Sequence, residues 1–158
     1  MIGQFAAALL LASQGLCVTE YPSGHSVRGG FTPDPGLPIF TVHNRRDEPA
    51  FVKLESIETG AVHVFFVDRL ASVGIDSVLP GDYSVSFAAD GRLDSACTLL
   101  VQAKSVTRFD QPFRFFRREV PLSDGSTKVE IGDNWIELGA GTDRSAGSTR
   151  ISIERFNQ

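Results

Sequence analysis

Apolar and polar residues alternate along most of the chain after residue 37, and turn-forming residues interrupt the alternation roughly every eight to twelve residues. A period of two places successive side chains on opposite faces of a β-strand. The clearest case follows the turn Pro80-Gly81-Asp82, where Tyr83, Val85 and Phe87 alternate with Ser84 and Ser86. The pattern therefore predicts many short strands.

Several other segments show the same alternation. The segment 62–67 differs in being apolar on both faces, which is typical of a central strand. No sustained period of 3.6 follows residue 20, which argues against a helical bundle or a crossover fold. We predict an all-β fold of two packed antiparallel sheets, a β-sandwich, with an open β-barrel as the alternative. The further strands are expected at 40–42, 52–55, 62–67, 97–104, 107–109, 113–117, 128–131, 135–138 and 150–156.

The length of 158 residues suits a single domain. Between Pro22 and Pro38, eight of the seventeen residues are Pro or Gly, which neither a helix nor a central strand sustains. We therefore expect a Pro/Gly-rich linker over 18–38 and a single β-sandwich domain over 39–158. Within that domain, 128–156 is a candidate for a separately packed C-terminal hairpin.

The first seventeen residues contain an apolar stretch from Phe5 to Ala12. As a helix, residues 2–18 would reach about 25 Å, less than the hydrocarbon core of a bilayer, so we expect no integral membrane span. Residues 1–17 have the size of a signal peptide, and Ser13-x-Gly15 or Gly15-x-Cys17 offers the small residues of a cleavage site, although no Lys or Arg precedes Phe5. An N-terminal helix is the alternative. If the segment is a signal peptide, we expect a periplasmic or extracellular protein. If it is a retained helix, we expect a cytoplasmic protein.

The chain has two cysteines, Cys17 and Cys97. A disulfide between them requires that both survive processing in an oxidising compartment. The alternation that begins at Cys97 instead favours a small buried apolar side chain at that position.

The segment Leu79-Pro80-Gly81-Asp82-Tyr83-Ser84-Val85-Ser86-Phe87 resembles the turn-and-strand signature of carboxypeptidase-regulatory-like, or transthyretin-like, β-sandwich modules. Apart from the family, Pro80 and Gly81 suit a tight turn, and the Tyr83 hydroxyl is placed to cap a neighbouring loop. The resemblance implies a small sandwich that serves as a spacer, adhesive or accessory module and has no catalytic residues of its own.

Composition and motifs narrow the function class. The formal net charge of −4 gives no electrostatic reason to bind nucleic acid. The three histidines are too widely spaced for a local zinc motif, and the chain lacks a calcium loop, a phosphate-binding glycine loop and a complete nucleophile elbow. We expect a protein that is not an enzyme and uses neither cofactor nor metal.

The most distinctive surface candidate is the run from Phe113 to Arg118. If Phe113 and Phe115 point into the core, Arg114 and Phe116 share the exposed face, and aromatic side chains flanked by cations are typical of interfaces. An edge strand that uses arginine against aggregation is the alternative. The candidate binding residues are Arg114, Phe116, Arg117, Arg118 and Trp135.

Our leading functional hypothesis is a structural or binding module of a larger envelope or extracellular assembly, acting through protein–protein contacts. The alternative is a carbohydrate- or small-ligand-binding domain that uses Trp135, the only tryptophan in the sequence.

Overall fold

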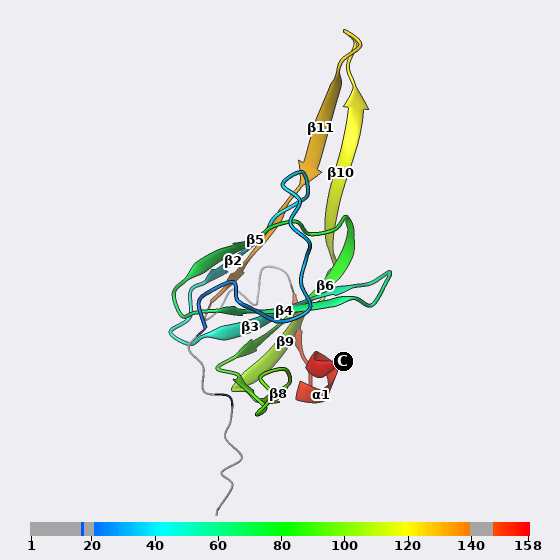
Figure 1. The fold of residues 1–158 in the computed structure, drawn as a ribbon. Helices are drawn as coiled ribbons and strands as arrows, with labels where there is room; N and C mark the ends of the chain where they lie inside the picture. The colour runs from blue at the N-terminus through cyan, green and yellow to red at the C-terminus, as the bar shows by residue number, and fades with distance from the viewer. Residues whose placement is uncertain (1–16, 18–20, 140–146) are drawn as a thin grey trace, which may run out of the picture.

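The computed structural model describes Cys17, residues 21–139 and residues 147–158, and it confirms the all-β prediction. Figure 1 shows the strands and one short helix in chain order. The elements are β1 (Ser26–Arg28), β2 (Phe40–Asn44), β3 (Ala50–Ser56), β4 (Val62–Val67), β5 (Ser72–Ile75), β6 (Gly81–Ala89), β7 (Arg92–Leu93), β8 (Leu100–Gln102), β9 (Ser105–Phe109), β10 (Phe113–Pro121), β11 (Thr127–Gly132), β12 (Asn134–Leu138), β13 (Ser148–Arg150) and α1 (Ile153–Asn157).

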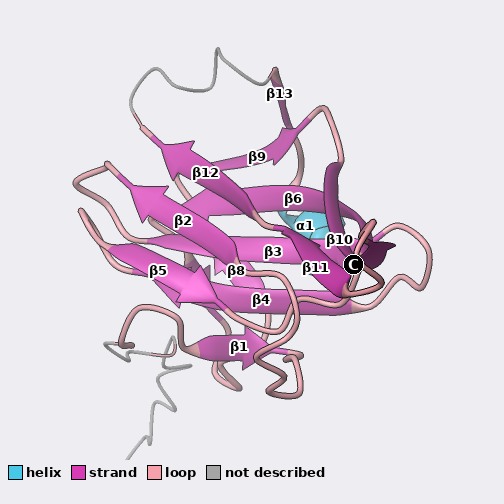
Figure 2. Cartoon of the chain, turned by 90° about the horizontal axis from the view of Figure 1, so that it is seen from above, coloured by secondary structure: helices cyan, strands magenta, loops and turns pink. Residues whose placement is uncertain are grey.

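Two sheets face each other to form the sandwich (Figure 2). The large sheet has the order β1-β4-β3-β6, and β6 then pairs with β9 along one part of its length and with β10 along another. The small sheet has the order β12-β2-β5. β9 pairs with residues 86–89 of β6, whereas β10 pairs with residues 81–83. Beyond these three pairs β10 leaves the large sheet and continues with β11 as its partner.

The main core lies between the two sheets and consists of the inward-facing residues of both. Phe40 of the small sheet contacts Phe65 and Phe115 of the large sheet in edge-on geometry, with ring centroids 6.3 and 5.8 Å apart. Val85 and Phe87 of the predicted strand are buried in the same cluster, and a turn at Thr59-Gly60 joins β3 to β4. Alternation therefore located these strands and their inward faces correctly.

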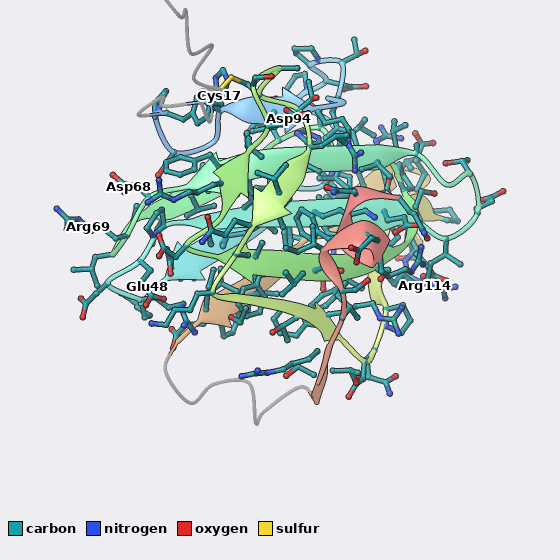
Figure 3. The ribbon with its side chains drawn as sticks, turned by 90° about the horizontal axis from the view of Figure 1, so that it is seen from below. Cys17, Glu48, Asp68, Arg69, Asp94 and Arg114 are labelled. Atoms are coloured by element: carbon teal, nitrogen blue, oxygen red, sulfur yellow. A yellow bond between two sulfur atoms is a disulfide. The ribbon has the colours of Figure 1, made fainter. Side chains whose placement is uncertain are left out.

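A second apolar cluster covers the opposite face of the large sheet, which the sequence did not predict. The short β7–β8 pair and α1 lie against this face (Figure 3). Phe51 and Phe66 of the sheet pack there with Leu100 and Phe156. The large sheet is therefore buried on both sides, which explains why β4 is apolar on both faces and why nearly every residue of β3, Lys53 included, is buried.

The described part of the expected linker packs onto the sandwich. β1 pairs with β4, the Gly24 amide donates to the Phe66 carbonyl at 2.7 Å, and the Asp34 amide donates to the Ser77 hydroxyl at 2.7 Å. Proline and glycine limit regular pairing here, but they do not prevent an extended chain from burying apolar side chains such as Phe31.

The C-terminal region also differs from the prediction. The segment 128–156 is not a separate hairpin, because β11 pairs with β10, β12 with β2 and β13 with β9. The strand expected at 150–156 is instead the end of β13 followed by α1, since the Ser152 hydroxyl caps the helix by accepting from the Arg155 amide. β12 runs parallel to β2, an exception to the antiparallel expectation that the long intervening chain permits.

The strand expected from Cys97 begins only at Leu100. Cys97 lies in a turn with φ +59°, and the Asp94 carboxylate closes that turn by accepting from the Thr98 amide at 2.9 Å. Rather than a buried free thiol, Cys97 forms a disulfide with Cys17, with the two Cα atoms 5.3 Å apart. The rest of the expected signal or helical segment, residues 1–16, lies outside the described residues.

Where the structure describes the chain, no helix has the length and apolar character needed to cross a bilayer.

Candidate interaction surface

β10 and β11 form a two-stranded ribbon that projects from the body of the molecule (Figure 1). The first three residues of β10 pair with β6, and the next six, Phe116–Pro121, pair with β11. Six antiparallel pairs extend about 20 Å. Within the described residues, this outer half of β10 has β11 as its only partner, and β11 is the last strand at its end of the large sheet.

Polar contacts fix the base of the ribbon to the sandwich. Arg114 donates to both carboxylate oxygens of Asp82, at 2.9 and 3.3 Å, and this ion pair raises the pKa of the Arg114 guanidinium. The Asn134 side chain donates to the Arg114 carbonyl at 2.7 Å, and the Asp133 carboxylate accepts from the Ile39 amide at 2.7 Å. Arg114 is exposed as predicted, but its charge is already engaged in holding the ribbon in place.

One face of the ribbon presents Phe116 and Arg118. The predicted split is observed, since Phe115 is buried whereas Phe116 is 38% exposed. Arg118 places its guanidinium 5.4 Å from the centre of the Phe116 ring and forms an ion pair with Glu130 at 2.6 Å. The hydrogen bond from Arg118 lowers the pKa of Glu130. Phe116 therefore belongs to an ordered cluster of side chains.

The other face combines Arg117 and Glu119 of β10 with two apolar residues of β11 that the sequence analysis did not select. Ile131 stands opposite Arg117, and Val129 stands opposite Glu119. Their exposed fractions are 42% and 44%. The signal was present in the sequence as Lys128-Val129-Glu130-Ile131, but alternation alone did not indicate that its apolar side would face away from the core.

Trp135 lies apart from this ribbon, on the outer face of the small sheet, and is 65% exposed. Its ring approaches that of His43 on the neighbouring strand, with centroids 6.1 Å apart. The His43 ring is itself hydrogen-bonded to the Ser72 hydroxyl at 2.8 Å. The small sheet therefore presents an exposed aromatic ring within a polar surface, and Trp135 is not a filler of the main core.

The ribbon carries nearly balanced charge. Ion pairs join Arg118 to Glu130, Lys128 to Glu130 and Arg117 to Glu119. The electrostatic field along the ribbon is therefore weak, and the surface is distinguished by its exposed apolar side chains rather than by a single sign of charge.

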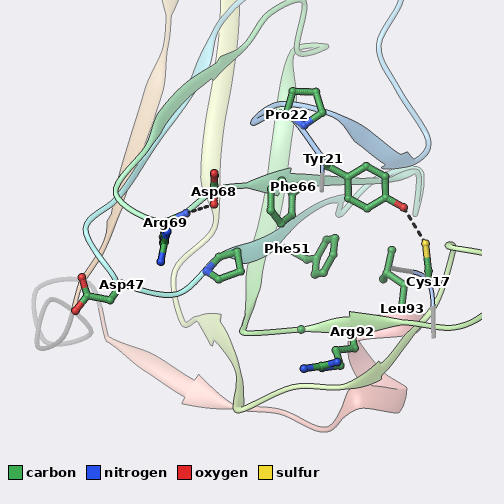
Figure 4. A pocket seen from close by; sticks show the side chains of 12 residues that line it. Cys17, Tyr21, Pro22, Asp47, Phe51, Phe66, Asp68, Arg69, Arg92 and Leu93 are labelled. Atoms are coloured by element: carbon green, nitrogen blue, oxygen red, sulfur yellow. Dashed lines mark hydrogen bonds between the residues drawn. The ribbon is translucent and has the colours of Figure 1, made fainter. Parts of the chain in front are cut away.

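A cleft of about 660 Å³ opens on the other side of the large sheet, beside the disulfide (Figure 4). Phe51, Phe66 and Tyr21 provide aromatic walls, and Arg69 and Arg92 line its edge. The Tyr21 hydroxyl lies 3.1 Å from the Cys17 sulfur. Cys17 and Tyr21 belong to the segment whose residues 18–20 lie outside the described chain, so we assign no function to this cleft.

The described side chains include no group of three or more His, Cys, Asp or Glu residues arranged to hold a metal ion. No protein-family model, curated protein or solved structure matches this chain.

Proposed function

We propose that this chain is a non-enzymatic binding module of a larger assembly and that the β10–β11 ribbon is its contact with another protein. The observation that supports this proposal most strongly is the exposure of apolar side chains on both faces of a projecting two-stranded ribbon. The members of this set are Phe116, Val129 and Ile131, with Leu122 in the connecting turn.

Exposure of these apolar side chains to water is energetically unfavourable. Two strands without a third strand or a packing layer are marginally stable, and exposed apolar strands promote association. Contact with a partner protein would bury these side chains, and arginine and aromatic residues contribute strongly to such contacts. The base of the ribbon supports the proposal, because the backbone pairing of residues 113–115 with β6 and the hydrogen bond from Asn134 hold the ribbon in a fixed direction and lower the entropy lost on binding.

We further propose that the assembly lies in the envelope or outside the cell. The Cys17–Cys97 disulfide supports an oxidising compartment. It also favours one processing site over the other, since cleavage after Gly15 keeps Cys17 whereas cleavage after Cys17 removes it. The resemblance of Leu79–Phe87 to transthyretin-like modules supports the same kind of accessory role.

Charge reversal tests the ribbon as a contact surface. We expect Arg117→Glu/Arg118→Glu to abolish recovery of the partner that the tagged wild-type chain brings down from its native cells. Thermal unfolding should be nearly unchanged, because ion pairs between exposed side chains contribute little to stability.

The matched control is Arg69→Glu/Arg92→Glu, which makes the same change in net charge at two exposed arginines away from the ribbon. The proposal requires that the control recover the same partner as the wild type. If Arg117→Glu/Arg118→Glu recovers as much partner as this control, the ribbon is not the contact surface.

The second candidate function is carbohydrate binding on the outer face of the small sheet. Trp135 favours it, because a flat aromatic ring exposed beside polar groups can stack on a sugar ring. Titration with a panel of neutral oligosaccharides, followed by fluorescence of the single tryptophan, tests this function. Saturable quenching, together with a heat of binding in calorimetry that Trp135→Ala abolishes, would support it, and unchanged fluorescence across the panel would count against it.

A further inference from the structure

A small cavity lies at one end of the sandwich, between the β3–β4 turn and the Leu79-Pro80 segment. Its volume is about 160 Å³. The inner wall is formed by Leu54, Tyr83 and His63, all buried, together with Phe31 from the N-terminal extended segment. The exposed residues of the turn and the Leu79-Pro80 segment form the rim.

Hydrogen bonds hold both sides of the rim in position. The Tyr83 hydroxyl donates to the Leu79 carbonyl at 3.0 Å, and the Gly60 amide donates to the Ser56 carbonyl at 2.9 Å in the opposite turn. Both sides of the opening are therefore tied to the sheet. The cavity is a feature of the ordered fold.

His63 is the unusual member of the wall. Its residue is 7% exposed, and both ring nitrogens are buried without a hydrogen-bond partner among the described residues. Its ring lies between aromatic neighbours, 4.6 Å from Phe31 and 5.6 Å from Phe65 between centroids. Buried polar groups nearly always have a partner, so an unpartnered imidazole beside a cavity needs an explanation.

The charge state of His63 follows from its burial, which lowers its pKa to about 4. At neutral pH the imidazole is uncharged and offers one N–H donor and one nitrogen acceptor. The outer torsion of a histidine side chain is soft, so the ring can turn a nitrogen toward a ligand without moving the backbone.

We propose that this cavity binds a small neutral molecule of single-ring size that carries a hydroxyl group, which hydrogen-bonds to His63 while the ring packs against Phe31, Leu54 and Tyr83. An apolar protein cavity of about 150 Å³ is large enough to hold benzene, which fixes the size class. A hydroxyl both donates and accepts, so it suits either orientation of the neutral imidazole. Among the described residues that line the cavity, the only charged one is Glu58, which lies at the exposed rim, and this favours a neutral ligand.

Phenol and toluene test this assignment, because they have nearly the same shape and differ in the hydroxyl. We expect phenol to bind the wild-type protein with a Kd of about 1 mM or lower and about tenfold more tightly than toluene. Phenol should also shift the ring ¹⁵N resonances of His63. This measurement on the wild-type chain needs no variant to fold.

His63→Leu should remove the preference for phenol while leaving toluene binding in place. The control His43→Leu changes a histidine whose ring is already hydrogen-bonded to Ser72, and it should keep the wild-type preference. Equal affinity for the two probes, no binding in the millimolar range, or phenol binding that leaves the His63 ring resonances unchanged would each overturn the proposal. None of these outcomes bears on the β10–β11 ribbon, so the two proposals fail independently.

Discussion

The ring of Phe116 occupies the space in which a side chain at Gly132 would begin. The two residues are cross-strand partners in the ribbon, and a Cβ atom at position 132 would overlap Cε1 and Cδ1 of the ring. Arg118 contacts the same ring. A glycine opposite an aromatic residue thus lets an exposed ring lie against the backbone, which keeps this apolar surface ordered in the free protein.

We predict that Gly132→Ala displaces Phe116 from this position without unfolding the protein. The alanine methyl and the ring cannot share the site, and the half-exposed ring is free to swing into solvent. The free energy of unfolding should change by less than about 1 kcal/mol. NMR contacts between the Phe116 ring and residue 132 should be lost. In the control Gly30→Ala, where a Cβ meets nothing within 4 Å, the NMR contacts of the Phe116 ring should stay as in the wild type. Loss of these contacts in both variants would contradict this account.

The buried imidazole predicts a specific loss of stability in acid. Burial lowers the pKa of His63 to about 4 from an ordinary value of 6.5, so between these two pH values the unfolded chain binds one more proton than the folded chain. Stability therefore falls as the pH drops from 6.5 toward 4, by about 3 kcal/mol in total.

Denaturant unfolding of the wild type and His63→Leu across this range isolates the effect. Carboxylates whose pKa is lowered in the fold, such as Glu48 and Asp94, contribute equally to both proteins and cancel in the difference. A stability difference that does not change between pH 6.5 and pH 4 would show that the His63 pKa is not depressed.

The disulfide should stabilise the fold by restricting the unfolded chain. Cys17 and Cys97 are 80 residues apart, and closing a long loop is worth about 2–4 kcal/mol in typical cases. We predict that reductant lowers the urea concentration at the unfolding midpoint of the wild type, by the shift that this loss of stability produces. The variant Cys17→Ser/Cys97→Ser should already have the lower midpoint and should not respond to reductant. A wild-type midpoint that reductant leaves unchanged would mean that the bond does not form or does not restrain the chain.

The sequence predicted what depends on a single strand and its two faces. Phe115 inward with Phe116 outward, and the Tyr83 hydroxyl capping a nearby loop, both follow from alternation and turn chemistry within ten residues of chain. These features are local, and the fold does not need to be known to infer them.

Features that depend on partners far along the chain were not predicted. The pairing of β10 with β11 and of β12 with β2 is selected by the packing of two sheets, which no local pattern records. For the same reason the packing of α1 and β8 against the large sheet was not predicted, because these segments were expected only as further strands at 150–156 and 97–104. Val129 and Ile131 were overlooked as surface residues because alternation does not say which face of a strand meets the core.

The most direct measurement of the central claim is site-specific photo-crosslinking in the native cells, with the photoreactive residue placed at Val129 on the ribbon or at Val101 on β8. The two positions have closely matched exposed fractions, 44% and 48%, and the strands that carry them, β11 and β8, lie at opposite ends of the molecule (Figure 1). The account predicts one discrete adduct to another protein from position 129, absent from position 101 and lost when Arg117→Glu/Arg118→Glu is added. No adduct from position 129, or the same adducts from both positions, would contradict it.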